Sequence, residues 1–428
     1  MLVTQAFRFE LSPNEEQKRA LTQHIGVARF VYNWGLERCK RALEEGKKIP
    51  SAYDLGKEWN QWKKENAPWW KEVSSKVPIQ ALRDLEQGLN KWRSKKSKFP
   101  RFKKKKINND NKARFYGSIR VFPKHIQLPR IGKVKSKEPT DRLLRLIEEG
   151  KARIISATIS QEADRFYVSL SCEVDREDPT PKEVKNAEDV VGIDLGLNSF
   201  AVLSNGEKTQ SPKPLAKNLK LLKRRNKQFS RKQKGSNNQK KAALKLARLH
   251  RKIKYQRLDF LHKLTTELAR TKPVLVIEDL NINGLMRGNL SRSVQDVGWG
   301  TFRRMLEYKT KWYGSTLIVA PRSFPSTRLC SRCGHLHGRI PLSQRIFKCE
   351  VCGLEIDRDL NASINLKKYG IAYLTGSTES SSESYACGDP SSGGTGLLVR
   401  STSYGSLKQE VAHYQLTLDG GLQNGGRT

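Results

Sequence analysis

The sequence contains no apolar run long enough to cross a bilayer, and its first residues do not form the hydrophobic segment of a secretory signal. We therefore expect a cytoplasmic protein with no membrane partner. Cysteine is also scarce, and three of the seven cysteines, Cys39, Cys172 and Cys387, are widely scattered. Such scatter fits a reducing compartment better than a disulfide framework.

Acidic residues are few, with 43 Asp and Glu against 81 Lys and Arg, which gives a formal net charge of +38. A protein with this charge repels itself unless it meets a polyanion. Nucleic acid is such a polyanion, because each neutralised phosphate releases a condensed counterion. A membrane surface, or a surface that only keeps the protein soluble, would be the alternative. The spread of charge over several segments rather than one tail favours nucleic acid.

Three acidic residues stand in separate, motif-like settings: Asp194 in VVGIDLGLN, Glu278 in PVLVIEDLN and Asp359 in EIDRDLNAS. The first two follow short β-branched apolar runs, which are typical of buried strands. An acid at the end of such a strand is unfavourable unless its charge is offset. Converging carboxylates that hold Mg²⁺ for phosphodiester cleavage would offset it. We therefore predict that these three residues are catalytic and bind two Mg²⁺ ions.

Four residues beside these acids are also of interest. Asp279 and Asp357 are weaker candidates for catalytic acids than the three above. Asp279 should point to the opposite side of its strand from Glu278. Gly192 and Gly196 would allow close approach of backbone and phosphate. The alternative for Asp194, Glu278 and Asp359 is that each is an ordinary surface residue. That would be the better interpretation of one acid alone, but three acids in this element order favour catalysis.

A cysteine pattern late in the chain, CSRCGHLHGRIPLSQRIFKCEVCG, has the spacing of a tetrahedral Zn²⁺ site. The predicted ligands are Cys330, Cys333, Cys349 and Cys352. Four thiolates leave the metal no open position, so the site should be structural. His335 and His337 are competing ligands, but we interpret them as exposed turn residues. Basic residues here suggest contact with a nucleic-acid backbone: Arg328, Arg332, Arg339, Arg345 and Lys348.

Two basic segments are candidate nucleic-acid surfaces. The first, RSKKSKFPRFKKKKINNDNK, interleaves aromatic rings that can stack on bases with cations that bind phosphates. The second, from Lys217 to Arg257, has 17 Lys and Arg and no acid, and its leucine stripe suggests a helical hairpin facing a nucleic-acid channel. In both cases the alternative is a solvated charged face. The predicted contacts are Arg101, Lys103, Lys104, Arg224, Arg225, Arg231, Lys232, Arg248 and Arg251.

The order of predicted elements indicates a multidomain α/β protein. A strand over 2–10 precedes a helical region, in which four tryptophans are interpreted as core rather than as base-stacking residues. Alternating runs over 113–176 suggest a small barrel or curled sheet. From Asp189, the order strand, hairpin, long helix, strand, helix, strand is typical of an RNase H-like fold. Residues 376–428 are rich in Ser, Gly and Thr, and are predicted to be disordered.

The motifs GIDLGLN, IEDLNINGL, CSRCG…FKCEVCG and DRDLNASIN, in this order, resemble those of the TnpB (OrfB) proteins of bacterial insertion sequences. These proteins are related to the type V CRISPR effector nucleases. The likeness extends to GVARFVYNWGL, FPRFKKKK and YACGD, and so covers nearly the whole chain. It implies RuvC-type acids at Asp194, Glu278 and Asp359, and a zinc ribbon on the four cysteines named above.

The resemblance also implies a division into domains. A wedge-like β-barrel would comprise 1–12 and 108–182, with a helical recognition domain, 13–107, inserted in it. A RuvC-like nuclease domain would comprise 183–324 and 356–375, interrupted by the zinc ribbon, 325–355.

The resemblance further implies RNA-guided cleavage of DNA next to a short adjacent motif. The partners would be a guide RNA from the transposon end and target DNA, both double-stranded and single-stranded, bound by a monomer in a prokaryotic, nucleoid-associated setting. The cofactors would be two Mg²⁺ and one Zn²⁺. Alternatives are a non-cutting RNA-guided repressor, a compact type V CRISPR effector, a transposase and a transcription factor that binds DNA through the ribbon. The intact acids count against the repressor.

Overall fold

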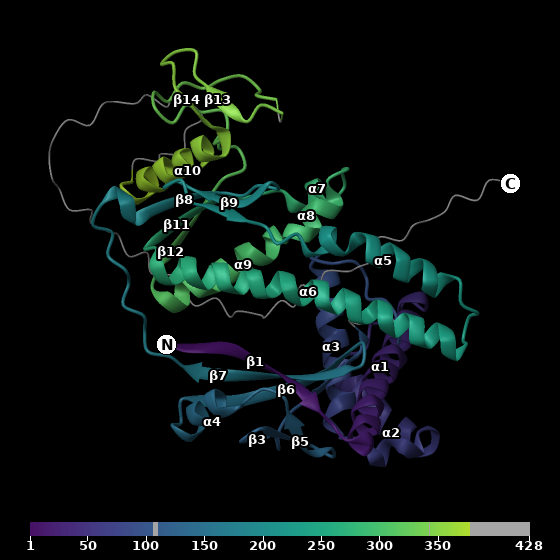
Figure 1. The fold of residues 1–428 in the computed structure, drawn as a ribbon. Helices are drawn as coiled ribbons and strands as arrows, with labels where there is room; N and C mark the ends of the chain where they lie inside the picture. Colours follow the sequence, from purple (N-terminus) through teal and green to yellow (C-terminus); the bar gives the residue numbers. More distant parts are fainter. Residues whose placement is uncertain (106–109, 342, 377–428) are drawn as a thin grey trace. The chain divides into compact units, whose positions relative to one another are not determined.

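The computed structural model describes residues 1–105, 110–341 and 343–376, which have a mixed α/β fold (Figure 1). The chain divides into two compact units, of which the first runs from Met1 to Glu177 and the second begins at Asp178. The predicted multidomain α/β class is therefore confirmed. The predicted disordered tail beyond Gly376, with Cys387 and the YACGD motif, lies outside the described residues. Where the structure describes the chain, it has no helix long and apolar enough to span a membrane.

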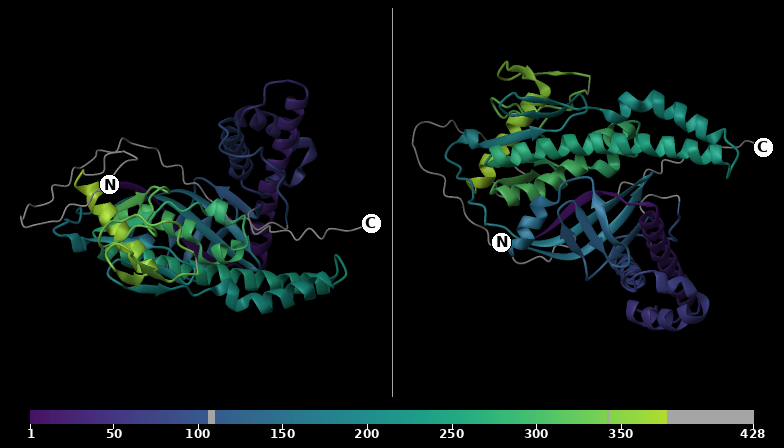
Figure 2. Two further views of the ribbon diagram at one scale, coloured as in Figure 1. Left: turned by 90° about the horizontal axis from the view of Figure 1, so that it is seen from above. Right: turned by 60° about the horizontal axis from the view of Figure 1, so that its bottom comes forward.

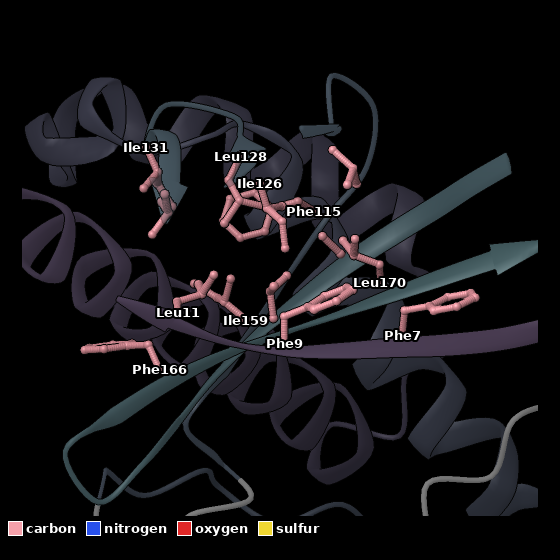
Figure 3. Packing of buried hydrophobic residues seen from close by; sticks show 14 of the residues in the cluster. Phe7, Phe9, Leu11, Phe115, Ile126, Leu128, Ile131, Ile159, Phe166 and Leu170 are labelled. Atoms are coloured by element: carbon pink, nitrogen blue, oxygen red, sulfur yellow. The ribbon is translucent and has the colours of Figure 1, made fainter. Parts of the chain in front are cut away.

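An antiparallel sheet of seven strands, in the order β2-β6-β7-β1-β5-β4-β3, forms the centre of the first unit. The strands are β1 (Leu2–Ser12), β2 (Lys112–Phe115), β3 (Arg120–Phe122), β4 (His125–Leu128), β5 (Gly132–Ser136), β6 (Ala152–Glu162) and β7 (Arg165–Asp175). Alternation along β1 places Phe7, Phe9 and Leu11 on one side of the strand. There they pack with Phe115 of β2 and Ile159 of β6 in the core of the unit (Figure 3).

Residues 113–176 also contain a helix that the alternating pattern did not predict, α4 (Asp141–Glu148). Leu143 is buried against the core, with Leu146 and Ile147 packed beside it. Eight residues are too few for helical periodicity to stand out between strands. The strands predicted in this region are all present.

The remaining helices of the first unit are α1 (Glu15–Glu44), α2 (Ala52–Asn66), α3 (Lys76–Arg93) and the 3₁₀ turn η1 (Pro68–Glu72). Helix α1 begins with a capping box, in which the Asn14 side chain accepts from the Gln17 amide at 2.8 Å and the Gln17 side chain accepts from the Asn14 amide. Trp59 is buried and stacks on Trp62, with ring centroids 5.4 Å apart, and Trp69 packs half-buried against the same core. The core interpretation is confirmed for these three tryptophans. The fourth, Trp70, is half-buried outside this core, with the Lys63 ammonium 4.4 Å from its ring centroid.

A five-stranded sheet in the order β10-β9-β8-β11-β12 forms the centre of the second unit. The strands are β8 (Val190–Asp194), β9 (Ser199–Leu203), β10 (Lys208–Gln210), β11 (Val274–Glu278) and β12 (Thr316–Ala320). Strands β8, β11 and β12 are parallel, whereas β9 pairs antiparallel with both β8 and β10. The parallel strands are rich in Val and Ile because both of their faces are covered.

Helices cover both faces of this sheet (Figures 1 and 2). The helices of this unit are α5 (Pro214–Ser230), α6 (Asn237–Thr271), α7 (Ile282–Leu285), α8 (Ser291–Val297), α9 (Trp299–Tyr313) and α10 (Arg358–Leu374). Val191 packs with Leu261 of α6 and Phe302 of α9, whereas its neighbour Val190 packs with Leu366 of α10. Successive strand side chains point to opposite faces, so α10 lies on the face opposite α6 and α9.

The predicted helical hairpin in the basic segment is confirmed. Helices α5 and α6 form a hairpin whose turn contains Gly235 at a φ of +86°, and Figure 2 shows the hairpin extending beyond the sheet. Three short elements, β10, α7 and α8, have no counterpart in the predicted order. Their three, four and seven residues carry too little periodicity to be recognised.

Two glycines allow α10 to lie close against the sheet. A Cβ on Gly192 would lie 2.0 Å from the Ser363 carbonyl oxygen, and one on Gly370 would lie 2.4 Å from Val276 Cγ2. The predicted reason for Gly192, close approach of a phosphate, is therefore wrong, because the helix occupies that space. Gly196 lies in the turn between β8 and β9, where a Cβ would lie 2.9 Å from the carbonyl oxygen of Ser199, the first residue of β9.

Candidate active site and metal centre

The structure brings the three predicted acids to one edge of the second sheet. Asp194 ends β8 and Glu278 ends β11, and the two strands are parallel neighbours with Ile193 paired to Ile277. Asp359 lies in the first turn of α10, which packs against β8. All three residues are half-buried.

The electrostatics of the site disfavour three bare negative charges. Burial, followed by the charges of Asp359 and Glu278, raises the pKa of Asp194 to about 8, against the opposing effect of Arg358. Burial also raises the pKa of Glu278, and a 3.4 Å hydrogen bond from the Ser326 hydroxyl lowers it in part. Charges that interact in this way lie close together, and a bound cation would relieve their repulsion.

The donor set suits Mg²⁺, because hard carboxylate oxygens are the ligands that this ion prefers. Among the described residues, only the four cysteines bring three or more potential ligand atoms all within 4.8 Å of one another. The three carboxylates are therefore spaced more widely than the ligands of one closed ion. This wider spacing suits Mg²⁺, because the ion keeps several of its waters and a two-ion site also needs room for substrate oxygens.

The second-ranked acids are engaged elsewhere. Asp279 pairs with Arg303 and, at 2.7 Å, with Arg322. Burial raises the pKa of Asp279, but hydrogen bonds from the two arginines outweigh this and leave the pKa below its usual range. Asp357 caps α10 by accepting from the Asp359 amide at 2.9 Å, and it pairs with Lys208 at 2.7 Å.

The four cysteines form a compact cluster in a small ribbon made by β13 (Ile346–Lys348) and β14 (Glu355–Asp357). The Cys330 and Cys352 sulfurs lie 3.6 Å apart, as do those of Cys333 and Cys349. Cys330 and Cys333 lie on one turn, and Cys349 and Cys352 lie on another. Each turn is closed by a glycine amide, and that glycine has a positive φ. Four thiolates at this spacing suit a structural zinc ion.

Three protein-family models match separate parts of the chain. Residues 169–289 match OrfB_IS605, "Probable transposase". Residues 299–366 match the Cas12f1-like TNB domain, and residues 1–48 match the helix-turn-helix domain of OrfB_IS605 proteins. In the structure, residues 1–48 comprise β1 and the single long helix α1.

Curated relatives match over most of their length. A protein of Streptomyces pristinaespiralis named "Putative RNA-guided DNA endonuclease" is 39% identical over 86% of this chain and 90% of its own. The chain belongs to the TnpB (OrfB) family. A protein of the same description from Mycobacterium tuberculosis is 34% identical and matches over 86% of its own length. Another, InsQ of Escherichia coli, is 31% identical and matches over 93% of its own length. The solved structure of CasPhi-2 (Cas12j) bound to crRNA covers 86% of this chain and 98% of its own at 10% identity, with a TM-score of 0.43, which is too low to bear on function.

In this TnpB-family chain, two of the predicted nucleic-acid contacts near residue 100 are engaged within the first unit. The Arg101 guanidinium pairs with Asp110 at 3.0 Å. The Lys103 ammonium lies over the Tyr32 ring, 3.8 Å from its centroid, and burial lowers its pKa. Lys104 donates its amide to Asp110 and leaves its side chain exposed. Of these three, Lys104 is the residue most open to a partner.

The six remaining predicted contacts belong to the α5–α6 hairpin. Arg224 and Arg225 lie on α5, Arg231 and Lys232 follow its end, and Arg248 and Arg251 lie on α6. Arg225 and Arg251 are half-buried and the other four are exposed. These six cations therefore belong to one projecting element, while Lys104 belongs to the other unit.

One histidine of the ribbon differs from expectation. His337 is half-buried, stands with Nε2 3.4 Å from Cys349 Sγ, and packs on Phe347 with ring centroids 5.0 Å apart. Its interpretation as an exposed turn residue is wrong, because the aromatic ring covers it. His335 is exposed as predicted.

Sequence reasoning missed four polar residues that contact the site or the ribbon: Ser326, Arg358, Asn361 and Asn365. Three of them belong to the motif DRDLNASIN, at helical spacing. Polar residues repeated on one helix face, where apolar residues would be expected, were the signal that could have identified them.

Proposed function

We propose that this protein is an RNA-guided DNA endonuclease of an insertion sequence, and that Asp194, Glu278 and Asp359 carry its cleavage site. The convergence of these carboxyl groups from β8, β11 and α10 is the observation that carries the proposal. Three mutually repelling acids are unfavourable without bound cations. The names of the TnpB-family relatives support the reaction class.

The second unit then corresponds to a RuvC-like nuclease domain of RNase H type, 183–324 and 356–375, with the zinc ribbon, 325–355, as an insertion. Support comes from a five-stranded sheet in which the first acid ends the central strand β8 and the second ends its neighbour β11. In the first unit, the sheet would form the barrel-like wedge, 1–12 and 108–182, and α1 to α3 the helical recognition domain, 13–107.

In this mechanism, Asp194, Glu278 and Asp359 would hold two Mg²⁺ ions, which activate water and stabilise the leaving oxygen of the scissile phosphate. The chain's own contribution is position and charge. Asp194 and Glu278 are fixed by neighbouring strands, and Asp359 by the first turn of a helix packed on the sheet. The exposed cations of the α5–α6 hairpin would bind phosphates without reading sequence, so base pairing with the guide RNA would supply specificity.

The test is cleavage of a plasmid that carries the target of the RNA co-purified with the protein. We expect Mg²⁺-dependent cleavage by the wild type and none detectable with Asp194→Ala. Asp259→Ala is the matched control, because Asp259 is an exposed acid paired only within its own helix. Equal products from wild type and Asp194→Ala would refute the site. Guided binding without cleavage by the wild type would identify a repressor, and joined donor ends would identify a transposase.

A further inference from the structure

The face of α10 that meets the ribbon is polar and buried. Arg358, Asn361 and Asn365 lie one turn apart on this face, and both asparagines are fully buried. Buried amides and guanidinium groups are unfavourable unless they form hydrogen bonds. What they bond to therefore indicates why this face is polar.

Both asparagines bind the backbone that leads into the first cysteine turn. Asn365 Nδ2 donates to the Ser326 carbonyl at 2.8 Å and to the Leu329 carbonyl at 2.6 Å. Asn361 Nδ2 donates to the same Leu329 carbonyl at 2.8 Å, and Asn361 Oδ1 accepts from the Ser331 amide at 2.9 Å. These bonds attach segment 326–331, which contains the zinc ligand Cys330, to the helix that carries Asp359.

The other end of the ribbon is attached to the same helix. Strand β14 continues directly into α10. The Arg358 amide donates to the Arg345 carbonyl at 2.8 Å, and Arg358 Nη1 donates to the Pro341 carbonyl at 2.7 Å. The residue next to Asp359 is thus bound to the loop that precedes β13.

Segment 326–331 also reaches the second catalytic acid. The Ser326 hydroxyl lies 3.4 Å from Glu278 Oε2, and Ser326 is buried. One short stretch of chain therefore has a zinc ligand near one end and a contact with Glu278 at the other. Asn365 binds this stretch at Ser326 itself and at Leu329, the residue before Cys330.

We propose that Asn361 and Asn365 are positioning residues that couple the folded zinc ribbon to the placement of Glu278 and Asp359. The inference rests on the proposed function in taking these acids as the metal ligands. Residues that orient metal ligands commonly alter metal affinity about 10- to 100-fold when they are substituted. Loss of zinc releases Cys330, and with it the backbone that Asn361 and Asn365 hold.

The test measures metal binding directly, with Mn²⁺ as the probe and loss of the free-ion electron paramagnetic resonance signal as the readout. The full chain is used without RNA. The Mn²⁺ binding that the wild type shows and that Asp194→Asn lacks is assigned to the carboxylates. We expect the Mn²⁺ dissociation constant to rise about tenfold or more in Asn361→Leu and Asn365→Leu, and about threefold in Ser326→Ala. Ser326→Ala keeps the Ser326 carbonyl, so it tests the contact with Glu278 even if an asparagine variant folds poorly.

Ser363→Ala is the matched control. Ser363 is a fully buried hydroxyl on the same helix, but it bonds only to the Leu360 carbonyl at 2.8 Å. Its Mn²⁺ dissociation constant should stay within about twofold of the wild type, since it does not touch the ribbon backbone.

Zinc removal completes the test. Cys330→Ala, with its zinc loss checked by elemental analysis, should weaken Mn²⁺ binding as much as Asn365→Leu does. Combining Cys330→Ala with Asn365→Leu should raise the Mn²⁺ dissociation constant little beyond the effect of either change alone, because both act through segment 326–331. Wild-type Mn²⁺ affinity in Cys330→Ala and in Ser326→Ala would overturn the inference. A wild type that binds Mn²⁺ with this dependence but cuts no DNA would refute the proposed function and leave the inference standing.

Discussion

At the scale of single residues, Asp194 shows how folding changes the chemistry of a side chain. Its pKa is raised to about 8, by burial first and then by the charges of Asp359 and Glu278. The unfolded chain has an ordinary aspartate, so the folded state without metal binds a proton that the unfolded state releases above about pH 4. The metal-free protein should therefore lose stability as the pH rises from about 4 to about 8.

Asp194→Asn should remove most of this pH-dependent loss of stability, because an amide has no charge to bury. In magnesium-free buffer at pH 8 we expect the variant to be more stable than the wild type by about 2 kcal/mol, allowing for partial exposure of the site. Thermal unfolding at pH 5 and pH 8 measures the effect, which should appear as a smaller fall in melting temperature. Added Mg²⁺ should stabilise the wild type more than the variant. Parallel pH profiles for the two proteins would contradict the assigned pKa shift.

At the scale of elements, the α5–α6 hairpin depends on one buried acid. Asp296 of α8 accepts from the Leu215 and Ala216 amides at the start of α5, at 2.9 and 3.0 Å. It also pairs with Arg257 of α6 at 3.2 Å. The carboxylate thus caps α5 and binds α6, which fixes the base of the hairpin. The many like charges of the two helices would otherwise push them apart.

Asp296→Ala should destabilise the second unit by about 3 kcal/mol, because it leaves a largely buried guanidinium and two helix amides with fewer partners. Hydrogen exchange at the start of α5 should increase in the same variant. Asp259→Ala provides the control, since its pair with Lys263 on α6 is exposed and should contribute less than about 0.5 kcal/mol. Similar effects of the two substitutions would show that Asp296 does not hold the hairpin.

At the scale of the whole molecule, the net charge of +38 predicts strongly salt-dependent binding to nucleic acid. The charge does not act uniformly, because some cations serve the fold itself. Arg101 pairs with Asp110 and Lys103 lies over Tyr32, whereas Arg231 and Lys232 are exposed at the end of α5. Equal changes in net charge at different places should therefore have unequal effects on binding.

Arg231→Gln/Lys232→Gln should lower the slope of log binding constant against log salt concentration by about 1.4 to 1.8, since each phosphate contact contributes about 0.7 to 0.9. Fluorescence anisotropy with the co-purified RNA at several salt concentrations measures this slope. Lys47→Gln/Lys48→Gln removes the same charge from exposed positions after α1 and should change the slope by less than about 0.5. A slope that falls equally in both variants would mean that net charge alone governs binding.

Features that depend on neighbouring residues could be predicted from the sequence. The spacing of the cysteines, the alternation along β1 and the apolar runs of β8 and β11 are local patterns, and the structure confirms each of them. The acids Asp194 and Glu278 could be selected because each directly follows such a run. The short elements β10, α4 and α7 could not be predicted, because brief segments do not repeat often enough to reveal a period.

The sequence by itself determined the family, the zinc-ligand spacing and the three candidate acids, because these depend on residue identity and on order along the chain. Only the tertiary structure decided that Gly192 makes room for α10, that His337 lies beside a thiolate, and that Asn361 and Asn365 join the ribbon to the helix of Asp359. Each of these is a contact between distant segments. The partner of a buried group is set by packing, which no local pattern specifies.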